Sequence, residues 1–501
     1  MKNIILLLIL ISNAATAQYK DMVWCFGDSA GINFSNPSNP TTFKSQIKSS
    51  IGATSAADSA GNLIYYVGGN NVPYIDHSKI FSGNHSIITN GDSIIGNGYC
   101  QLSSIPYPNF KNRFIVFSNY MDSNTKGFYY NIFDMNANYQ NGNVINKNNK
   151  LLPITASGIA TCKHANGRDW WVVIKDGHFV LNDSIYIFLV TPNGIQGPFK
   201  HKTNAVMTYE PNFQQFYFNH KGDEMFYINT SGNIDKYDFD RCTGLLSNPI
   251  VIDTEKPIQQ QPAYISACYS PNDSLLYISS LNMILVNTGN ILYQIKLKQM
   301  PLKLDTIYHF SQPVKVGLLK EGPDNKIYLA AEPFYYNTFY NDTDYNAYNT
   351  HLSVINQPNM PGQLCDLQPF SFYLGGYRTY WELPNNPNYN LGALAGSVCD
   401  TLTTAIAPVT AQEAAGLNLN YINAWQKLYV NATKLRGKKC TVKIYAVNGT
   451  LIYQNTTITN PPFFTTEINC RAFSSGMYIL NLSTELETVS AKFVKSGTGN
   501  D

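Results

Sequence analysis

Short stretches in which apolar and polar residues alternate follow one another along most of the chain. The clearest is 291–298, where Ile291, Tyr293, Ile295 and Leu297 are separated by polar residues. A period of two places every second side chain on the same face, as in a β-strand that is half-buried in a sheet. Long apolar patterns with the helical period of 3.6 are almost absent from the sequence. The pattern therefore predicts an all-β protein.

Six polar turns recur at nearly regular steps, and each stands directly before an apolar stretch. They contain Gly61, Asn112, Gly167, Gly222, Asp273 and Asn325. The steps between these residues are 51, 55, 55, 51 and 52. A polar turn followed by an apolar strand every fifty-odd residues is typical of the blades of a β-propeller.

The length of the repeat suggests the number of blades. Residues 19–396 number 378, and 378 divided by 7 is 54, so we expect a seven-bladed β-propeller over 18–396. Six turns are visible, and we expect the seventh blade to combine the segment 374–383 with the N-terminal strand near 23–34. Such closure removes the exposed sheet edge that would otherwise pair with a neighbour. Six or eight blades remain open at this stage.

A second, smaller domain is expected after a linker. Residues 397–414 are rich in Thr and Ala, as linkers are. Five more short strands are predicted at 440–445, 451–454, 463–468, 477–483 and 489–494. Closely spaced short strands indicate a small immunoglobulin-like β-sandwich, which we place at 415–501.

The first seventeen residues have the pattern of a signal peptide. Lys2 supplies a positive start, 4–11 are an unbroken apolar run, and 15–17 read Ala-Thr-Ala. The run is too short to cross a bilayer as a helix, and no later stretch approaches that length. We predict Sec export to the periplasm with cleavage between Ala17 and Gln18, leaving 501 − 17 = 484 residues.

The charge of the chain argues against two classes of partner. Charged residues make up 14% of the sequence and the formal net charge is +2. Such a balance creates no field that would gather nucleic acid or an anionic membrane. We therefore expect no nucleic acid among the partners; the lack of a long apolar stretch after the signal peptide predicts no membrane span.

The nine cysteines are an odd number, so they cannot all pair within one chain. Export makes disulfides feasible. Closeness in sequence favours Cys440 with Cys470 and Cys365 with Cys399. Buried free thiols are the alternative for each pair.

No local catalytic motif stands out. The eight histidines are scattered, and none belongs to an H-E-x-x-H, G-x-S-x-G or S-x-x-K pattern. His164 and His220 lie in predicted blade turns, where a histidine usually holds the turn by hydrogen bonds. We therefore predict no catalytic residue, no cofactor-binding residue, no metal ligand and no cofactor.

The segment after the sixth turn can be interpreted as a metal site or as a ligand platform. Asp342, Asp344 and Asn346 alternate like the ligands of a calcium loop, but Ala347 and Ser353 stand where that loop needs Gly and Glu. Tyrosines crowd the same segment and could form a platform for a ligand, since their rings stack on sugars. The candidate platform residues are Tyr335, Tyr336, Tyr340, Tyr345 and Tyr348. The alternative, which the usual burial of such rings favours, is packing over two blade edges.

Three sequence blocks at the end of the chain carry a family resemblance. They are Val442–Gly449, Ser475–Leu480 and Lys492–Lys495, in that order. Together they resemble the C-terminal sorting domain of proteins exported by the type IX secretion system. The usual Pro-Asn-Pro opening is missing, and six residues follow Lys495. An immunoglobulin-like accessory domain is the alternative.

The resemblance implies a partner, a location and a set of signal residues. The partner is the type IX secretion machinery, and the location is outside the cell or on the outer-membrane surface of a Gram-negative bacterium. The residues on which the sorting signal is expected to rest are Gly449, Gly476, Tyr478, Lys492, Phe493 and Lys495.

The large domain resembles uncharacterised secreted propeller proteins that carry such tails. The matching blocks are 24–27, 237–240, 322–328 and 351–359. This resemblance implies architecture and export, and it assigns no activity.

Three functions are compatible with these features. The first is a secreted or cell-surface binding module whose glycan or protein ligand contacts the loops at one mouth of the ring. The second is a polysaccharide hydrolase or lyase whose carboxylates come from different blades. The third is a structural component of the cell surface or gliding apparatus. Two carboxylates facing each other across the mouth would favour the hydrolase.

Overall fold

The computed structural model describes most of residues 19–495. The segments outside the description are 1–18, 50–51, 70–76, 97–101, 121–125, 137–140, 155, 177–183, 203–212, 256–261, 282–289, 312, 334–344, 401–415, 423–425, 434, 459–463 and 496–501.

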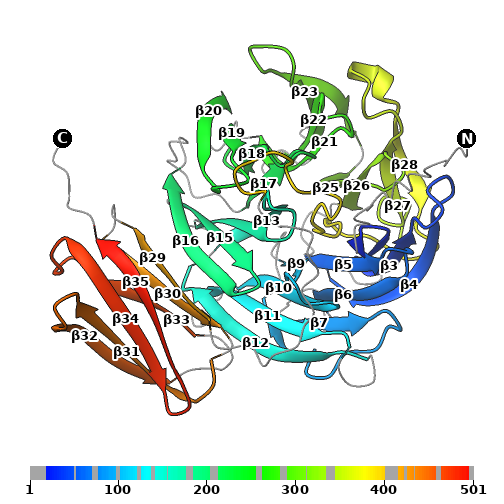
Figure 1. The fold of residues 1–501 in the computed structure, drawn as a ribbon. Helices are drawn as coiled ribbons and strands as arrows, with labels where there is room; N and C mark the ends of the chain where they lie inside the picture. The colour runs from blue at the N-terminus through cyan, green and yellow to red at the C-terminus, as the bar shows by residue number, and fades with distance from the viewer. Residues whose placement is uncertain are drawn as a thin grey trace, which may run out of the picture.

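The described residues before position 374 form seven antiparallel sheets arranged around a centre (Figure 1). The first contains β1 (Tyr19–Lys20), β5 (Ala53–Asp58), β6 (Leu63–Gly69), β7 (His77–Ser82) and β8 (Ile94–Ile95). The second contains β9 (Leu102–Pro106), β10 (Arg113–Tyr120), β11 (Gly127–Asp134) and β12 (Asn143–Leu152). The third contains β13 (Ala156–Lys163), β14 (Trp170–Asp176), β15 (Ser184–Thr191) and β16 (Gly194–Lys202).

The remaining sheets complete the ring. The fourth contains β17 (Gln214–Phe218), β18 (Glu224–Asn229), β19 (Ile234–Phe239) and β20 (Leu246–Asp253). The fifth contains β21 (Ala263–Tyr269), β22 (Leu275–Leu281), β23 (Ile291–Lys296) and β24 (Leu304–His309). The sixth contains β25 (Val314–Glu321), β26 (Ile327–Pro333), β27 (His351–Ile355) and β28 (Leu367–Tyr373), with the 3-10 helix η2 (Gly362–Cys365) before β28. The seventh contains β2 (Val23–Phe26), β3 (Asp28–Asn33) and β4 (Thr41–Lys48).

The recurring turns join the first two long strands of each sheet from the first to the sixth. All six predicted turn residues have a positive φ, between 53° for Asp273 and 87° for Gly61. Gly, Asn and Asp adopt this left-handed conformation most easily, which explains why these residue types recur there. The all-β propeller architecture predicted from the repeat is confirmed.

Apolar clusters between neighbouring sheets close the ring. One cluster runs from the first sheet through the second to the third, and three others join the third to the fourth, the fourth to the fifth and the fifth to the sixth. A further cluster joins the sixth sheet to the seventh and the first. In it the ring of Trp24 meets that of Tyr328 edge-on at 5.6 Å. Each sheet thus buries its faces against two neighbours, as the blades of a propeller do.

The seventh sheet differs from the expectation in its composition. Its three strands all come from the N-terminal region, whereas the segment 374–383 was expected to add a strand. That segment does arrive beside it, but it pairs only by isolated bridges from Arg378 to Asp28 and Ser29. Gly27 leaves room for this approach, because a Cβ there would lie 2.3 Å from the carbonyl oxygen of Arg378. At this position the backbone of Arg378 passes close to Gly27 in place of the regular hydrogen-bond ladder of a fourth strand.

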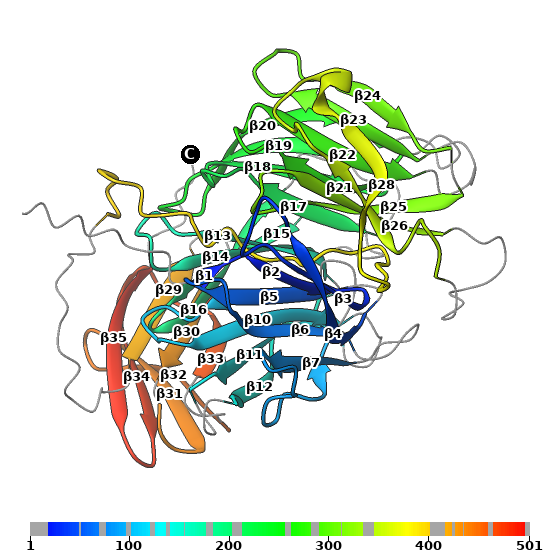
Figure 2. The ribbon, with the colours of Figure 1, turned by 90° about the vertical axis from the view of Figure 1, so that its right-hand side faces the viewer.

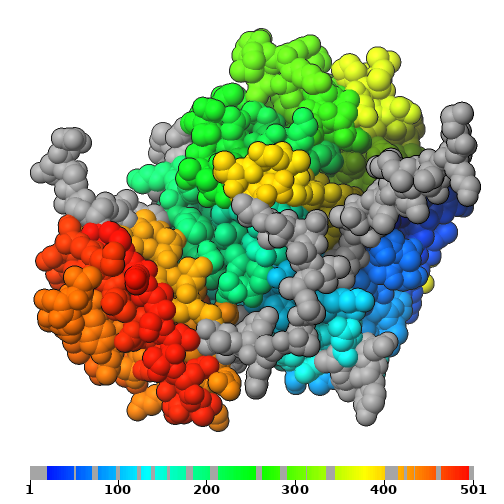
Figure 3. All heavy atoms as spheres, in the orientation of Figure 1, coloured from blue at the N-terminus to red at the C-terminus, as the bar shows by residue number. Residues whose placement is uncertain are grey.

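Residues 378–394, which we call the closing segment, continue into the centre of the ring. Trp381 accepts a hydrogen bond from the backbone N–H of Leu318 in β25 at 2.8 Å. Four residues later the backbone N–H of Asn385 donates to Ala53 in β5, also at 2.8 Å. The closing segment therefore lies between the sixth and first sheets before it crosses the ring, where yellow atoms cover the middle of one face (Figure 3).

The disulfide pairing predicted from sequence is wrong. The bond joins Cys242 to Cys399, which are 157 residues apart. Cys365, Cys440 and Cys470 are buried free thiols, which was the alternative. Closeness in sequence was a poor guide to the pairing of Cys365 with Cys399. Cys365 is buried between the fifth and sixth sheets, whereas Cys399, which follows the closing segment, lies at a turn of the fourth sheet.

The C-terminal part is a two-sheet sandwich. One sheet contains β29 (Gly416–Ile422), β30 (Lys427–Thr433) and β33 (Phe464–Asn469). The other contains β31 (Lys439–Ala446), β32 (Leu451–Ile458), β34 (Gly476–Thr484) and β35 (Thr488–Lys495). Both sheets contribute to one apolar core. Strand β30 contacts β16 of the third propeller sheet, as the two views show (Figures 1 and 2). Among the described residues, no helix has the length and apolar character to span a bilayer.

Candidate functional site

A cavity of about 570 Å³ lies where four central strands end. Its walls come from β13, β17, β21 and β25, from residues 20–22, and from residues 383–391 of the closing segment. These strands belong to the third, fourth, fifth and sixth sheets, which converge at the centre of the ring. Loops and strand ends at the mouth of a propeller are a usual place for a ligand site.

Two adjacent asparagines fix the closing segment as a wall of the cavity. The side-chain amide of Asn385 donates to the carbonyls of Leu102 and Ile159, at 3.1 and 2.8 Å. The Oδ1 of Asn386 accepts from the backbone N–H of Ser55 at 2.7 Å. The innermost strand of a blade has an unpaired edge, and an asparagine carries both the donor and the acceptor such an edge needs. Three sheets are thereby attached to one short segment.

The far end of the closing segment is also anchored. Arg241 donates to the carbonyl of Gly392 at 2.5 Å, and the backbone N–H of Leu394 donates to Ala165 at 2.7 Å. The disulfide of Cys399 with Cys242 follows five residues later. This wall of the cavity is consequently held at both ends.

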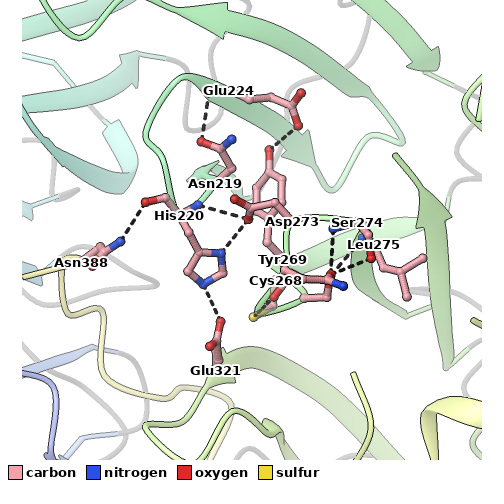
Figure 4. A network of polar contacts seen from close by, with 12 residues as sticks. Asn219, His220, Glu224, Cys268, Tyr269, Asp273, Ser274, Leu275, Glu321 and Asn388 are labelled. Carbon is pink, nitrogen blue, oxygen red and sulfur yellow. Dashed lines mark hydrogen bonds and ion pairs between the residues drawn. The ribbon is translucent and has the colours of Figure 1, made fainter. Parts of the chain in front are cut away.

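His220 connects three sheets at the cavity (Figure 4). It lies in the turn between β17 and β18, and its Nδ1 is 2.6 Å from Oδ1 of Asp273 in the corresponding turn of the fifth sheet. Its Nε2 is 2.6 Å from Oε2 of Glu321, the last residue of β25. Asn388 of the closing segment donates to the carbonyl of His220 at 3.2 Å. One side chain thus joins the fourth, fifth and sixth sheets.

The two carboxylates keep His220 positively charged. Burial by itself would lower the pKa of the imidazole, but the hydrogen bonds and charges of Asp273 and Glu321 outweigh it and raise that pKa to about 10. Both ring nitrogens then carry protons and donate. At neutral pH this histidine has no free lone pair with which to act as a general base.

A second ion pair stands at another wall of the cavity. Nζ of Lys320 is 2.6 Å from Oδ2 of Asp21 and 5.1 Å from the centre of the Trp24 ring. Oδ1 of Asp21 accepts from the indole of Trp24 at 2.9 Å and from Asn386 at 2.5 Å. Burial raises the pKa of Asp21, although Lys320 opposes this shift. Both oxygens of this carboxylate are therefore occupied.

The tyrosines proposed as a ligand platform are only partly described. Tyr335, Tyr336 and Tyr340 lie outside the described residues. Tyr345 is 48% exposed, but its hydroxyl donates to Asp28 at 2.8 Å and its ring lies 4.7 Å from the Arg378 guanidinium. Tyr348 packs edge-on against Phe370 at 5.1 Å. The contacts of these two rings fit the packing alternative.

The predicted sorting residues fall into two groups. Lys495 is 6% exposed and donates to the carbonyls of Cys470 and Phe473 at 2.7 and 2.6 Å. The rings of Tyr478 and Phe493 stack at 5.3 Å inside the sandwich. The solvent-facing group contains Lys492, Gly449 and Gly476. The predicted cleavage residues Ala17 and Gln18 lie outside the described residues.

Sequence reasoning did not find the cavity. It interpreted His164 and His220 as turn-holding residues, and His164 indeed accepts from Asn166 at 3.0 Å within its own turn. The acidic partners of His220 are 53 and 101 residues away, so no local spacing links them. The run of asparagines at 385–390 was the one visible signal, because such a run in a closing segment indicates repeated side-chain bonding to strand edges.

One family model matches the end of the chain. Residues 424–496 match the secretion system C-terminal sorting domain, and this domain implies type IX secretion and a location outside the cell or on its surface. No curated protein matches the sequence.

Solved structures similar to the chain include several propellers. A candidate 6-phosphogluconolactonase of Bacteroides fragilis has 12% identity and a TM-score of 0.43, with 74% of this chain and 98% of that chain covered. The periplasmic gluconolactonase PpgL of Pseudomonas aeruginosa has 10% identity and a TM-score of 0.34, with 79% and 95% covered. The Dos1 propeller has 12% identity and a TM-score of 0.40, with 72% and 83% covered.

Proposed function

We propose that this protein is exported through its C-terminal sorting domain and acts outside the cell as a binding module, with its glycan or protein ligand in the cavity of the propeller. The observation that carries the proposal is the cavity of about 570 Å³, which is walled by four sheets and by a closing segment anchored at both ends. A pre-formed concave site of this size is typical of small-ligand binding.

The carboxylates of the cavity favour binding over hydrolysis. A glycoside hydrolase needs two carboxyl groups that flank a bond of the substrate with free space between them. Asp273 and Glu321 instead lie on either side of one imidazolium, and Asp21 is paired with Lys320. The two described carboxylates that line the cavity, those of Asp21 and Glu321, are thus both engaged in ion pairs.

The proposed domains follow the same order as in the sequence analysis. Residues 1–17 would direct export to the periplasm, 18–396 would bind the ligand, 397–414 would act as a linker and 415–501 would dock on the export machinery. The exposed position of Lys492 supports a contact between the sandwich and that machinery.

A glycan array with the purified full chain tests the proposal. Asn390 is an exposed residue at the cavity wall, so Asn390→Trp should block entry and weaken any binding at least about tenfold. Asn455→Trp on the exposed strand β32 is the matched control and should bind normally. Every bound glycan is also incubated with the protein to detect hydrolysis.

Two results would overturn the proposal. One is binding that Asn390→Trp and Asn455→Trp affect equally, since the ligand would then lie outside the cavity. The other is turnover of a bound glycan, which would make the protein an enzyme. If no glycan binds, the same two variants are compared for retention of proteins from the surface of the source cells.

A further inference from the structure

The sandwich carries the excess positive charge of the chain. Residues 416–495 contain nine Lys and Arg residues, three Glu and no Asp, which is a net charge of +6. The whole chain has +2, so the remaining residues together have −4. The three glutamates already have partners within the sandwich, namely Lys427, Arg436 and the backbone N–H groups of residues 438 and 439. The charge of this domain therefore favours an acidic partner.

The sheet of β31, β32, β34 and β35 has one face on the core of the sandwich and one face toward solvent, which we call the outer face. In β34, for example, Tyr478 and Leu480 belong to the core, whereas Met477 and Ile479 alternate with them on the outer face. The other sheet contacts the propeller through β30. In both ribbon views the four-stranded sheet lies on the side of the sandwich away from the propeller (Figures 1 and 2). The outer face is thus open to a partner.

A row of paired residues crosses the outer face from β32 to β35. Tyr445 in β31 pairs with Leu451 on one side and with Ile479 on the other. Ile479 in turn pairs with Lys492. Directly paired residues of an antiparallel sheet point to the same side and contact each other. The row therefore consists of three apolar or aromatic side chains and one lysine.

Apolar residues collect at one end of the outer face. Next to the row, Met477 pairs with Val494, and Val447 follows Tyr445 by two positions. We call Val447, Leu451, Met477 and Val494 the apolar end; they are 46–68% exposed. A contiguous exposed apolar patch with a polar border indicates an interaction site on a soluble domain.

Two lysines border the apolar end. Lys492 ends the row, and Lys443 lies on the outer face just before it. Neither has an ion pair among the described residues. The other solvent-facing residues predicted to carry the sorting signal also lie at this end. Gly449 is in the turn between β31 and β32, and Gly476 begins β34 directly before Met477.

These features fit a protein partner better than a lipid surface or a second copy of the chain. Recognition of an anionic membrane takes clusters of about four to eight Lys or Arg residues, whereas two border the apolar end. A second copy docked face to face would bring four unpaired lysines together, and like charges oppose association. An apolar centre with a charged border is the usual composition of a contact between proteins.

We propose that the apolar end, together with Lys443 and Lys492, docks on a protein of the export machinery whose contact surface has an apolar centre and an acidic border. This inference rests on the proposed function and adds the surface of the sandwich that is recognised and the chemistry of the partner. The lysines attract the acidic border, and the apolar residues leave water when the two surfaces meet.

Export of the full chain by the source cells tests the surface. Met477→Glu places a carboxylate in the apolar end and should lower the fraction of the protein delivered outside the periplasm at least about tenfold. Ile458→Glu is the matched control. Ile458 is 83% exposed and lies opposite Lys439 at the other end of the same face, so this variant should be exported normally. Both variants should keep the melting temperature of the natural protein, because both side chains face solvent.

Reversal of single charges tests the acidic border of the partner. Lys492→Glu and Lys443→Glu should each reduce export, whereas Lys492→Arg, which keeps the charge, should retain it. Lys438→Glu makes the same change of charge at an exposed position outside the apolar end and should be exported normally. A loss of export in Lys438→Glu as large as in Lys492→Glu would show that only the total charge of the sandwich matters, which would overturn the proposed surface.

Cross-linking in cells identifies the partner. A photo-reactive amino acid at position 494 of the full chain should become linked to a component of the export machinery, through a segment that contains Asp or Glu. The same amino acid at position 458 should not be linked to that component. Linkage from position 494 to lipid, to lipopolysaccharide or to a second copy of the chain would overturn the proposed partner.

The outcomes separate this inference from the proposed function. Equal export of Met477→Glu and Ile458→Glu would overturn the apolar end as the docking surface. If a chain without residues 415–501 then stays in the periplasm, the sandwich still directs export and only its docking surface is assigned wrongly. If that shortened chain is also delivered normally, the proposed route of export fails together with this inference.

Discussion

At the scale of single residues, the ion pairs of His220 with two carboxylates determine its role at the cavity. His220 could be taken for a catalytic base because it is a histidine in a cavity with two carboxylates. Its two ring nitrogens, however, are both used as donors, so it attaches the turns of neighbouring sheets to each other. His164, by contrast, contacts no carboxylate: its Nδ1 accepts from Asn166 in its own turn at 3.0 Å and its Nε2 lies 3.0 Å from the carbonyl oxygen of Cys242 in the fourth sheet.

The pH dependence of stability should report this role of His220. Its pKa rises from the ordinary 6.5 to about 10 on folding, so the stabilisation is complete below about pH 6.5 and is lost as the pH rises through 10. More than a third of the side chain (37%) is exposed, and screening by water reduces the effect to on the order of 1 kcal/mol. Melting temperatures from pH 6 to 10 should therefore fall more steeply for the natural protein than for His220→Gln.

The comparison between variants matters because other groups titrate in the same range. Burial, with help from Arg241, lowers the pKa of Lys163 to about 8, and this contribution is present in both proteins. His309→Gln at an exposed position is the control and should keep the slope of the natural protein. Parallel curves for the natural protein and His220→Gln would show that the charge of His220 adds no pH-dependent stability and would contradict this role.

At the scale of elements, the closing segment replaces a regular strand with a series of specific bonds. Asn385 and Asn386 bind strand edges, Arg241 binds a carbonyl near the end, and a disulfide follows. A β-strand would have paired with one neighbour, whereas this irregular segment reaches the first, second and third sheets in two residues.

Loss of the disulfide should weaken the closing segment. The bond between Cys242 and Cys399 closes a loop of 157 residues, and a bond of this kind typically contributes about 2–4 kcal/mol by restricting the unfolded chain. Cys399→Ser should lower the unfolding free energy by that amount, as measured by urea denaturation. Cys365→Ser, at a buried free thiol, is the control for a cysteine lost without a bond. Alkylation of Cys399 in the unreduced native protein would contradict the pairing.

The last strand of the sandwich combines two lysines with different roles. Nζ of Lys495 donates to backbone carbonyls of the segment that follows β33, whereas Lys492 is exposed on the same strand. Lys495→Met should lower the stability of the sandwich by about 1–3 kcal/mol, because buried carbonyls lose their donor. Lys492→Met should leave the melting temperature unchanged and reduce export. Equal melting temperatures for the two variants would contradict this division.

At the scale of the whole molecule, the propeller and the sandwich have separate cores. The ring does not need the sandwich to bury its sheets, and the sandwich carries the residues that match the sorting domain. Separate cores allow one part to be recognised for export while the other keeps its fold.

Deletion of residues 415–501 should therefore trap a folded propeller in the periplasm. Cell fractionation with immunodetection would locate the shortened protein, and circular dichroism of the purified form would check its fold. Lys495→Met provides a milder comparison in which the tail is present but weakened. Normal delivery of the shortened chain to the cell surface would refute the role assigned to the tail.

Much of the fold could be predicted from local sequence. The six turn residues were identifiable because a left-handed turn selects Gly, Asn or Asp, and the same turn recurs wherever a blade begins. Period-two alternation located strands such as β23 for a similar reason, since each residue's exposure depends on the face of its own strand. The sorting blocks were found because they are contiguous in sequence.

Only the tertiary structure decided the cavity, the disulfide and the composition of the seventh sheet. His220 meets Asp273 and Glu321 because the ends of the inner strands converge when the ring closes. Cys242 meets Cys399 because the chain that follows the closing segment reaches the turn between β19 and β20. Sequence patterns indicate which residues lie on each face of a strand. The curvature and closure of the whole ring determine which distant residues lie together in the wall of the cavity.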